Sequence, residues 1–378
     1  MKRFFAFTAV AALLASFLLF DTQCIINNEN PTEGNTSTDK TTDTTTAVDT
    51  TTDSTGDTTT VVDTTTTDTS SHVSAQDTGI IYTLTGGGGF SCLAIDEQHN
   101  MYTVWSNGLE THLWRITSSG TRSVFSDSSK IKALGAINCL YWDTAGNKLL
   151  AIVNDSAIVE FSAGGDPSAI YTGGKDLGFN HAENMLKDAA GNWYASNLMG
   201  LNQKIFKITA AGVGSLLLQP ADPTGIGAMA INQDGDLIYV SNGLFKLPSG
   251  GTTEQPLFPD LGNSIKAAYE AANGAIPAGA IQTKFKVDVY SFGQDAAGNI
   301  YTEGKVEYTV GSYPDFTTTT SRHLMKITPA GVVTFVETMD TTFHSAAYYQ
   351  CRGEYLYSIR YIKTGGWSYS TNIYRRRL

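Results

Sequence analysis

Apolar and polar residues alternate in short runs through residues 79–378, and most of these runs end at a turn. Side chains that alternate with a period of two lie on opposite faces of an extended chain, so the pattern predicts β-strands. Residues 263–273 differ and predict a short capped helix inside an insertion. The sequence therefore predicts an all-β domain with a helical insertion.

A turn of the form Asp-x-x-Gly-Asn recurs between the first and second strand of each repeat. Glycine supplies positive φ, and Asp or Asn can bond to its own backbone, so the turn predicts a hairpin. The six occurrences are residues 96–100, 143–147, 188–192, 232–236, 295–299 and 350–354. The first of them contains no glycine.

A third strand of the form apolar-aromatic-Lys/Arg-Ile-Thr follows each turn. Its six copies are residues 112–117, 157–162, 204–209, 243–248, 323–328 and 372–375. Six repeats in this region give about 50 residues each, which is the size of a four-stranded propeller blade. The last repeat reaches only its third strand, and residues 80–84 form a strand before the first repeat. We therefore predict a six-bladed β-propeller that this N-terminal strand closes.

The repeats resemble those of NHL-type propellers and of the wider group of gluconolactonase-like six-bladed propellers. The resemblance covers residues 79–378 and rests on turns such as residues 191–194 (Gly-Asn-Trp-Tyr) and 298–301 (Gly-Asn-Ile-Tyr). It also rests on the strand ending Lys-Ile-Thr-x-x-Gly. Enzymes of the gluconolactonase-like group hold a divalent metal at the mouth of the central channel with Glu, Asn and Asp.

The resemblance implies a metal site at the corresponding positions of this chain. Residues of ligand type stand just before four of the turns: Asn138, Glu183, Asp288 and His344. Oxygen donors suit Ca²⁺ or Mg²⁺, and imidazole suits Zn²⁺. The alternative is a solvated polar channel that needs no cofactor. We assign no catalytic residue, because no glycine cluster leads into a phosphate-loop motif and no compact catalytic motif is present.

Two insertions enlarge the fifth repeat: residues 256–285 lengthen the entry to the blade, and residues 303–321 lengthen the loop between its second and third strands. Propeller topology places them on one face together with the loops between the second and third strands of neighbouring repeats. The candidate ligand-binding residues of this face are Trp105, Tyr308, Tyr313, Phe316, Trp367 and Tyr369. Aromatic side chains on such a rim suit sugar or peptide partners. The alternative is that they pack the insertions onto the blades.

The chain begins with two basic residues and an uncharged apolar run at residues 4–20, which is typical of a secretory signal. Cys24 stands where a bacterial lipoprotein signal places its lipidated cysteine, although residues 21–23 (Asp-Thr-Gln) differ from the usual lipobox. We assign residues 1–24 to a signal peptide with Cys24 as the lipidation site. Ordinary cleavage and an uncleaved anchor are the alternatives, and all three export the rest of the chain.

Residues 25–78 predict a disordered Thr/Asp-rich tether. From Cys24 to Thr78 there are ten acids and one base, a net charge of −9. Few apolar residues mean too little burial to offset the entropy of ordering. Residues 79–378 carry 25 acids and 22 bases, so the domain is nearly neutral and lacks the basic field that nucleic-acid binding needs.

Three further cysteines are present, and an odd number gives no disulfide framework. Cys92 and Cys139 each precede an Asp by four residues, so we expect both at buried, equivalent positions of two repeats.

Taken together, these features predict an exported monomer held at the cell envelope, on the outer membrane or cell surface, through a lipid anchor. We expect its propeller to bind a protein, peptide or carbohydrate. The alternative is a metal-dependent hydrolase or lyase of the gluconolactonase-like type.

Overall fold

The computed structural model describes residues 78–84, 89–107, 109–180, 182–197, 203–220, 226–241, 243–312, 315–339, 343–365 and 368–378. The predictions for the signal peptide, Cys24 and the tether lie outside the described residues, as do Tyr313 and Trp367. The side chains of Asp288, His344 and Tyr369 are likewise not described.

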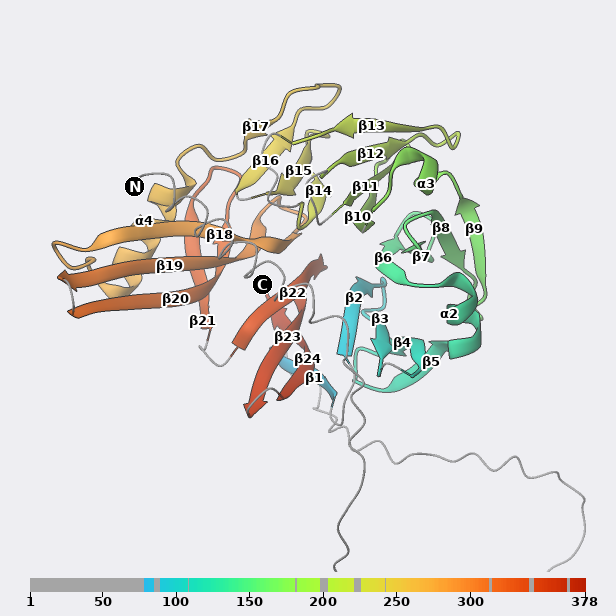
Figure 1. The fold of residues 1–378 in the computed structure, drawn as a ribbon, viewed down its shortest axis with the longest axis horizontal. Coiled ribbons are helices and arrows are strands. Elements are labelled where there is room, and N and C mark those ends of the chain that lie inside the picture. Colours follow the sequence, from blue (N-terminus) through green and yellow to red (C-terminus); the bar gives the residue numbers. More distant parts are fainter. Residues whose placement is uncertain are drawn as a thin grey trace, which may run out of the picture. The chain divides into compact units, whose positions relative to one another are not determined.

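Six four-stranded antiparallel sheets surround a common axis (Figure 1). The first three blades are β2 (Gly89–Ile95), β3 (Met101–Ser106), β4 (Thr111–Ile116) and β5 (Arg122–Ser126); β6 (Ile137–Asp143), β7 (Lys148–Val153), β8 (Ala157–Phe161) and β9 (Pro167–Tyr171); and β10 (Ala182–Lys187), β11 (Trp193–Asn197), β12 (Ile205–Ile208) and β13 (Gly214–Leu218). The remaining blades are β14 (Met229–Ile231), β15 (Leu237–Val240), β16 (Leu244–Leu247) and β17 (Gln255–Pro256); β18 (Ile281–Gln294), β19 (Ile300–Ser312), β20 (Asp315–Ile327) and β21 (Val333–Met339); and β22 (Phe343–Arg352), β23 (Tyr355–Gly365), β24 (Ser368–Arg377) and β1 (Gly79–Leu84). The six-bladed propeller is confirmed.

The sixth blade takes its outer strand from the start of the domain. Strand β1 pairs antiparallel with β24, from Gly79 opposite Arg375 to Leu84 opposite Thr371. The Thr83 hydroxyl also donates to the Asn372 amide oxygen over 2.8 Å. The ring closure expected from residues 80–84 is therefore confirmed.

The repeated turn is held by its first residue. In the third blade the Asp188 carboxylate accepts hydrogen bonds from the backbone and the side chain of Asn192, each over 2.8 Å, and from the Tyr194 hydroxyl over 3.1 Å. The same set recurs in the fifth blade around Asp295 and in the first blade around Asp96. One carboxylate thus ties the turn to the second strand, which explains the spacing of Asp, Asn and aromatic residue.

The first turn places His99 where each of the five other turns has glycine. Its φ is 62°, in the left-handed region that costs energy for a residue with a Cβ. The His99 Nδ1 atom lies 2.9 Å from the Tyr357 hydroxyl of the sixth blade. The strained backbone at His99 therefore coincides with a contact between the first and the sixth blade.

The core consists of apolar clusters between neighbouring blades. Ala94 and Leu113 of the first blade pack with Leu149 and Ala151 of the second, and corresponding clusters join the other neighbours. Cys92 and Cys139 are buried free thiols in these clusters, as expected from their positions in the repeats. Each blade is thus stabilised by the blades on either side.

The outer strands of four blades share an irregularity at the same register. Where the outer strand pairs with the third strand of its blade, one residue of the outer strand is left without an opposite residue. These bulged residues are Phe125, Ile170, Leu217 and Val336. Such bulges increase the local twist of an edge and hinder pairing with another chain. The periphery of the propeller is therefore poorly suited to edge-to-edge association.

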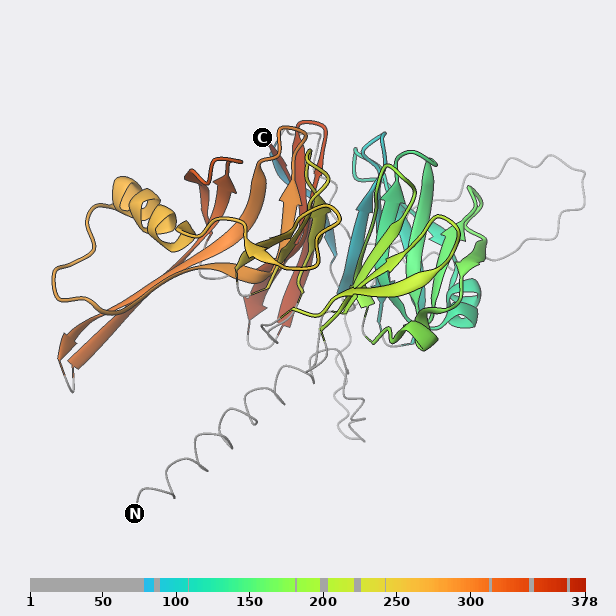
Figure 2. The same cartoon turned by 90° about the horizontal axis from the view of Figure 1, so that it is seen from above.

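The fifth blade extends beyond the others (Figure 2). Helix α4 (Leu261–Asn273) confirms the predicted helix and packs through Ile265 and Tyr269 against the extended sheet. The second insertion, expected as a loop, instead continues two strands, with β19 and β20 paired as far as Ser312 opposite Asp315. Its alternating residues prolong the hairpin rather than interrupt it.

Two shorter helices, α2 (Ser128–Leu134) and α3 (Gly174–Leu177), connect strands at the periphery. In the stretches that the structure describes, no helix combines the length and the apolar character needed to cross a bilayer.

Candidate functional site

The starts of the first strands meet the turns between second and third strands at one end of the ring. Asp155, in the turn between β7 and β8, accepts a hydrogen bond from the Asn138 side chain over 2.5 Å and from the Ala182 backbone over 3.0 Å. Asn138 lies near the start of β6, and Ala182 begins β10. The shared face expected from propeller topology is therefore confirmed for the second and third blades. We call Asn138, Asp155 and Glu183 the mouth site.

Asp155 is aimed at the mouth by an unusual turn. Asn154 and Asp155 both have positive φ, 49° and 50°, as the two central residues of a type I′ turn do, and the Ser156 backbone N–H donates to the Val153 carbonyl over 3.0 Å. The Asn154 side chain accepts from the Ala136 backbone and donates to the Leu134 carbonyl, which fixes the turn against the chain leading into β6. Sequence reasoning missed Asp155, although an Asn-Asp pair between two apolar strands is a signal for such a turn.

Glu183 carries the perturbed carboxyl group of the mouth site. Burial and the nearby charge of Asp155 raise its pKa from 4.5 to about 7. The side chain is only partly buried, so it remains within reach of solvent and of a ligand. A carboxyl group that titrates near neutral pH at the end of a channel is a candidate functional group.

The inner strands are irregular around this site. Cys92 in β2 and Tyr348 in β22 both adopt positive φ, 61° and 58°, where the pairing of their strands with the next strand is interrupted. The first strands of the second and third blades are also interrupted near their starts. Bulges and strained backbone re-aim side chains and concentrate near binding sites.

The neighbouring thiols are unreactive. Burial raises the pKa of Cys139 to about 12, with a further contribution from the Glu183 charge. Burial, Cys139 and Glu183 likewise raise the pKa of Cys92, whose thiol donates to the Asn138 carbonyl over 3.1 Å. Both thiols stay protonated at neutral pH, so neither is a nucleophile.

The donor set of the mouth site fits a hard cation in part. Two carboxylates and an amide supply oxygen atoms, which suit Ca²⁺ or Mg²⁺. Within the described residues, no group of three or more His, Cys, Asp or Glu side chains is placed to hold a metal ion. Of the four predicted ligands, Asn138 and Glu183 both lie near Asp155. The structure does not describe the side chains of the other two, Asp288 and His344. The metal site stays a prediction.

The predicted ligand-binding aromatic residues whose side chains are described differ in their surroundings. The Trp105 ring stacks on Trp114 with centroids 5.0 Å apart and an interplanar angle of 12°, so it packs within the first blade. Tyr308 contacts Tyr269 of α4 with ring centroids 6.3 Å apart, so it helps to pack the insertion. Phe316 is 48% exposed near the end of the extended hairpin. Binding by the predicted aromatic rim stays a prediction.

No protein family model matches this chain, and no curated protein matches it. Among solved structures, it is similar to a putative gluconolactonase at 14% identity and a TM-score of 0.48, over 82% of this chain and 93% of the other. It is also similar to a streptogramin B lyase at 12% identity and a TM-score of 0.46, over 78% and 95%. For virginiamycin B lyase from Staphylococcus aureus the identity is 10% and the TM-score 0.45, over 82% and 98%.

The class of this protein is a six-bladed β-propeller, and its own strand pairing defines that class.

Proposed function

We propose that this chain is an exported binding propeller, displayed at the cell envelope, that holds its partner at the mouth site. The observation that carries the proposal is the raised pKa of Glu183 beside Asp155. A carboxyl group whose ionisation is disfavoured by a nearby carboxylate is stabilised in its charged form when a positive group lies beside it. The partner, a peptide, protein or glycan, would therefore present an ammonium group or several hydrogen-bond donors to the mouth.

The proposal is tested with tri-lysine as the probe and its fully acetylated counterpart as the control peptide. Calorimetric titration of the full chain should give tighter binding of tri-lysine at about pH 8 than at about pH 5, because Glu183 is ionised only above its pKa of about 7. Glu183→Gln and Asp155→Asn should each weaken binding by about ten-fold, in line with the loss of a charge-assisted hydrogen bond.

The matched control is Asp234→Asn, which removes an exposed carboxylate from a turn of the fourth blade. It should leave the affinity unchanged. Equal binding of both peptides, or binding that neither mouth variant weakens, would contradict the proposal.

A second candidate is a metal-dependent hydrolase or lyase of the gluconolactonase-like type. The same pair of carboxyl groups favours it, because a divalent cation relieves their repulsion as well as an ammonium does. Asn138, Asp155 and Glu183 would hold the cation through oxygen atoms, and a bound cation would polarise a substrate carbonyl. The metal content of the purified full chain, wild type beside Glu183→Gln, separates the candidates: one tightly held ion lost in the variant favours the enzyme.

The aromatic rim offers the partner a second contact. Phe316 is the exposed member of that set whose side chain is described, and it lies on the extension of the fifth blade. A large partner held at the mouth site would be expected to lose affinity in Phe316→Ala without any change in the stability of the domain.

A further inference from the structure

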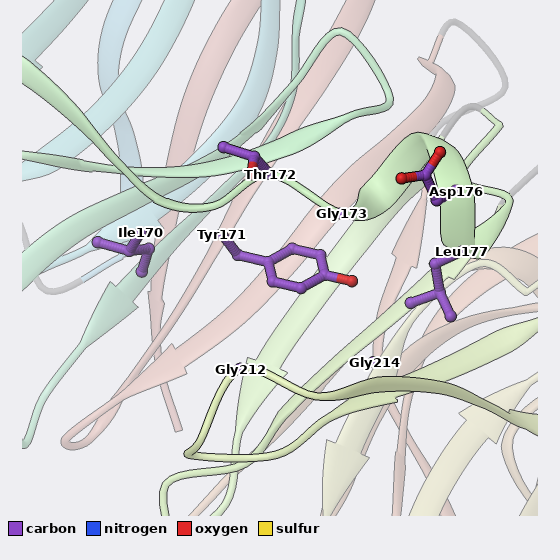
Figure 3. A pocket seen from close by; sticks show the side chains of 8 residues that line it. All are labelled: Ile170, Tyr171, Thr172, Gly173, Asp176, Leu177, Gly212 and Gly214. Carbon is purple, nitrogen blue, oxygen red and sulfur yellow. The ribbon is translucent and has the colours of Figure 1, made fainter.

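A hollow of about 510 Å³ lies between the end of β9 in the second blade, with the residues that follow it, and the start of β13 in the third blade (Figure 3). Its walls come from the end of β9, the short helix α3 and the start of β13. The lining residues are Ile170, Tyr171, Thr172, Gly173, Asp176, Leu177, Gly212 and Gly214. We call this hollow the rim groove.

Tyr171 is fixed in the rim groove by two glycines. A Cβ added at Gly214 would lie 2.5 Å from the Tyr171 hydroxyl oxygen, and one added at Gly173 would lie 2.7 Å from it. Figure 3 shows the ring extending toward α3, with Gly212 and Gly214 along the facing wall. On its inner side the ring contacts Phe179, with centroids 6.5 Å apart. The absence of two side chains thus creates the slot that orients this ring.

Three polar side chains of the rim groove form no hydrogen bond or ion pair with a described residue. Among the described residues, the Tyr171 hydroxyl, the Thr172 hydroxyl and the Asp176 carboxylate form no hydrogen bond or ion pair. Burial, and then the charge of Asp176, raises the pKa of Tyr171, so its hydroxyl stays protonated and can donate. The groove therefore offers one carboxylate acceptor and two hydroxyls that both donate and accept.

The apolar surface lies beside these polar groups. Ile170 is 44% exposed, and Val213 and Leu216 on the adjoining edge of the third blade are 64% and 50% exposed. None of the described lining residues is a lysine, arginine or histidine, whereas Asp176 would repel an anionic ligand. A suitable ligand carries several hydroxyl groups and one apolar face, and has no negative charge.

We propose that the rim groove is a binding site for a neutral saccharide, with Tyr171 as its aromatic platform and Asp176 and Thr172 as partners of the sugar hydroxyls. The volume of the groove accommodates one or two sugar units. Because the groove is open and shallow, affinity for a single unit should lie in the millimolar range. None of the residues that line the rim groove belongs to the mouth site.

Saturation-transfer NMR on the full chain tests the proposal, with methyl glycosides of glucose, galactose, mannose and N-acetylglucosamine as probes. At least one glycoside should receive saturation, and its affinity should fall five-fold or more in Tyr171→Ala, which removes the aromatic platform, and in Asp176→Asn. Asp234→Asn, an exposed carboxylate elsewhere, and Glu183→Gln, at the mouth site, should leave the affinity unchanged.

Four results would overturn the proposal. The first is no saturation of any of the four glycosides. The second is a signal that persists in both groove variants, which would place the sugar elsewhere on the chain. The third is tighter binding of tetramethylammonium than of every glycoside, lost in Asp176→Asn, which would make the groove a cation site. Loss of the sugar signal in Glu183→Gln alone would assign it to the mouth site.

Discussion

Asn138 and Glu183 could be placed at the mouth from the sequence because each stands at a fixed distance before a repeated turn. Asp155 could not, since it belongs to the short turn between β7 and β8, which lies outside the repeated motif. Its position depends on the positive φ of Asn154 and Asp155, which no repeat unit encodes. The perturbed pKa of Glu183 was equally out of reach, because it arises from burial and from Asp155.

The titration of Glu183 predicts a pH-dependent stability. The folded state keeps a proton on Glu183 between pH 4.5 and about 7, where the unfolded chain has lost it. The free energy of unfolding should therefore fall as the pH rises through this window and stay low above it. Glu183→Gln should stabilise the domain at about pH 8 by on the order of 1–2 kcal/mol relative to wild type, after allowance for partial solvent screening.

Urea unfolding at about pH 8 and at about pH 4 measures this difference. The gain should be absent at about pH 4, where Glu183 is protonated in both states. If Glu183→Gln lowers the free energy of unfolding equally at both pH values, the titration of Glu183 does not control the stability of the domain.

At most positions an alanine variant is more stable than a glycine variant, and at His99 we expect the opposite order. At a φ of 62°, alanine keeps the backbone strain and loses the contact with Tyr357, whereas glycine loses the contact but relieves the strain. His99→Gly should therefore be more stable than His99→Ala by about 1 kcal/mol. The neighbouring exposed Gln98 is the control, because its φ is not positive and glycine should be the less stable choice there. Chemical denaturation of the alanine and glycine variants at both positions measures their free energies of unfolding. An alanine variant that is the more stable at His99 as well would contradict the prediction.

At the scale of elements, the repeated turns and third strands were predictable because each is a local pattern. The Asp carboxylate, the Gly and the period-two alternation act within a few residues, so they survive in the folded chain. The extended hairpin of the fifth blade was not predicted, since its Thr-rich end was interpreted as a loop. Whether a strand continues past its blade depends on a partner strand and on α4, which local patterns do not reveal.

Tyr308 and Phe316 lie on that hairpin and should respond differently to truncation. Tyr308→Ala removes a ring that packs against Tyr269 of α4 and should lower the free energy of unfolding by about 2–3 kcal/mol. Phe316→Ala should change it by no more than about 0.5 kcal/mol, because the side chain is 48% exposed. Denaturant midpoints of the two variants give the comparison. Equal losses would mean that the hairpin end is packed as firmly as the part beneath α4.

At the scale of the whole molecule, the ring closure predicts a cooperative loss. Deleting residues 80–84 removes the buried side chains of Ile81, Tyr82 and Leu84 and opens the edge of β24. With about 1.5–3 kcal/mol for each buried side chain, the loss should be about 5 kcal/mol or more. Calorimetry of the full chain should show a lower melting temperature for the entire domain.

A deletion of equal length at residues 41–45, in the Thr-rich segment, is the matched control and should leave the melting temperature unchanged. A domain that melts normally without residues 80–84 would contradict the role of β1 in closure.

The partnership of β1 with β24 also determines the order in which the fold can be completed. Thr83 and Asn372 are 289 positions apart, so the strand that leaves the ribosome first must wait for the strands that leave it last. Non-local pairing of this kind slows folding, because the ends must meet before their contacts stabilise anything. Translation that stops before β24 would leave β1 without a partner and β23 paired on one side only, with β22. A truncated product would therefore expose unpaired strand edges and become prone to aggregation.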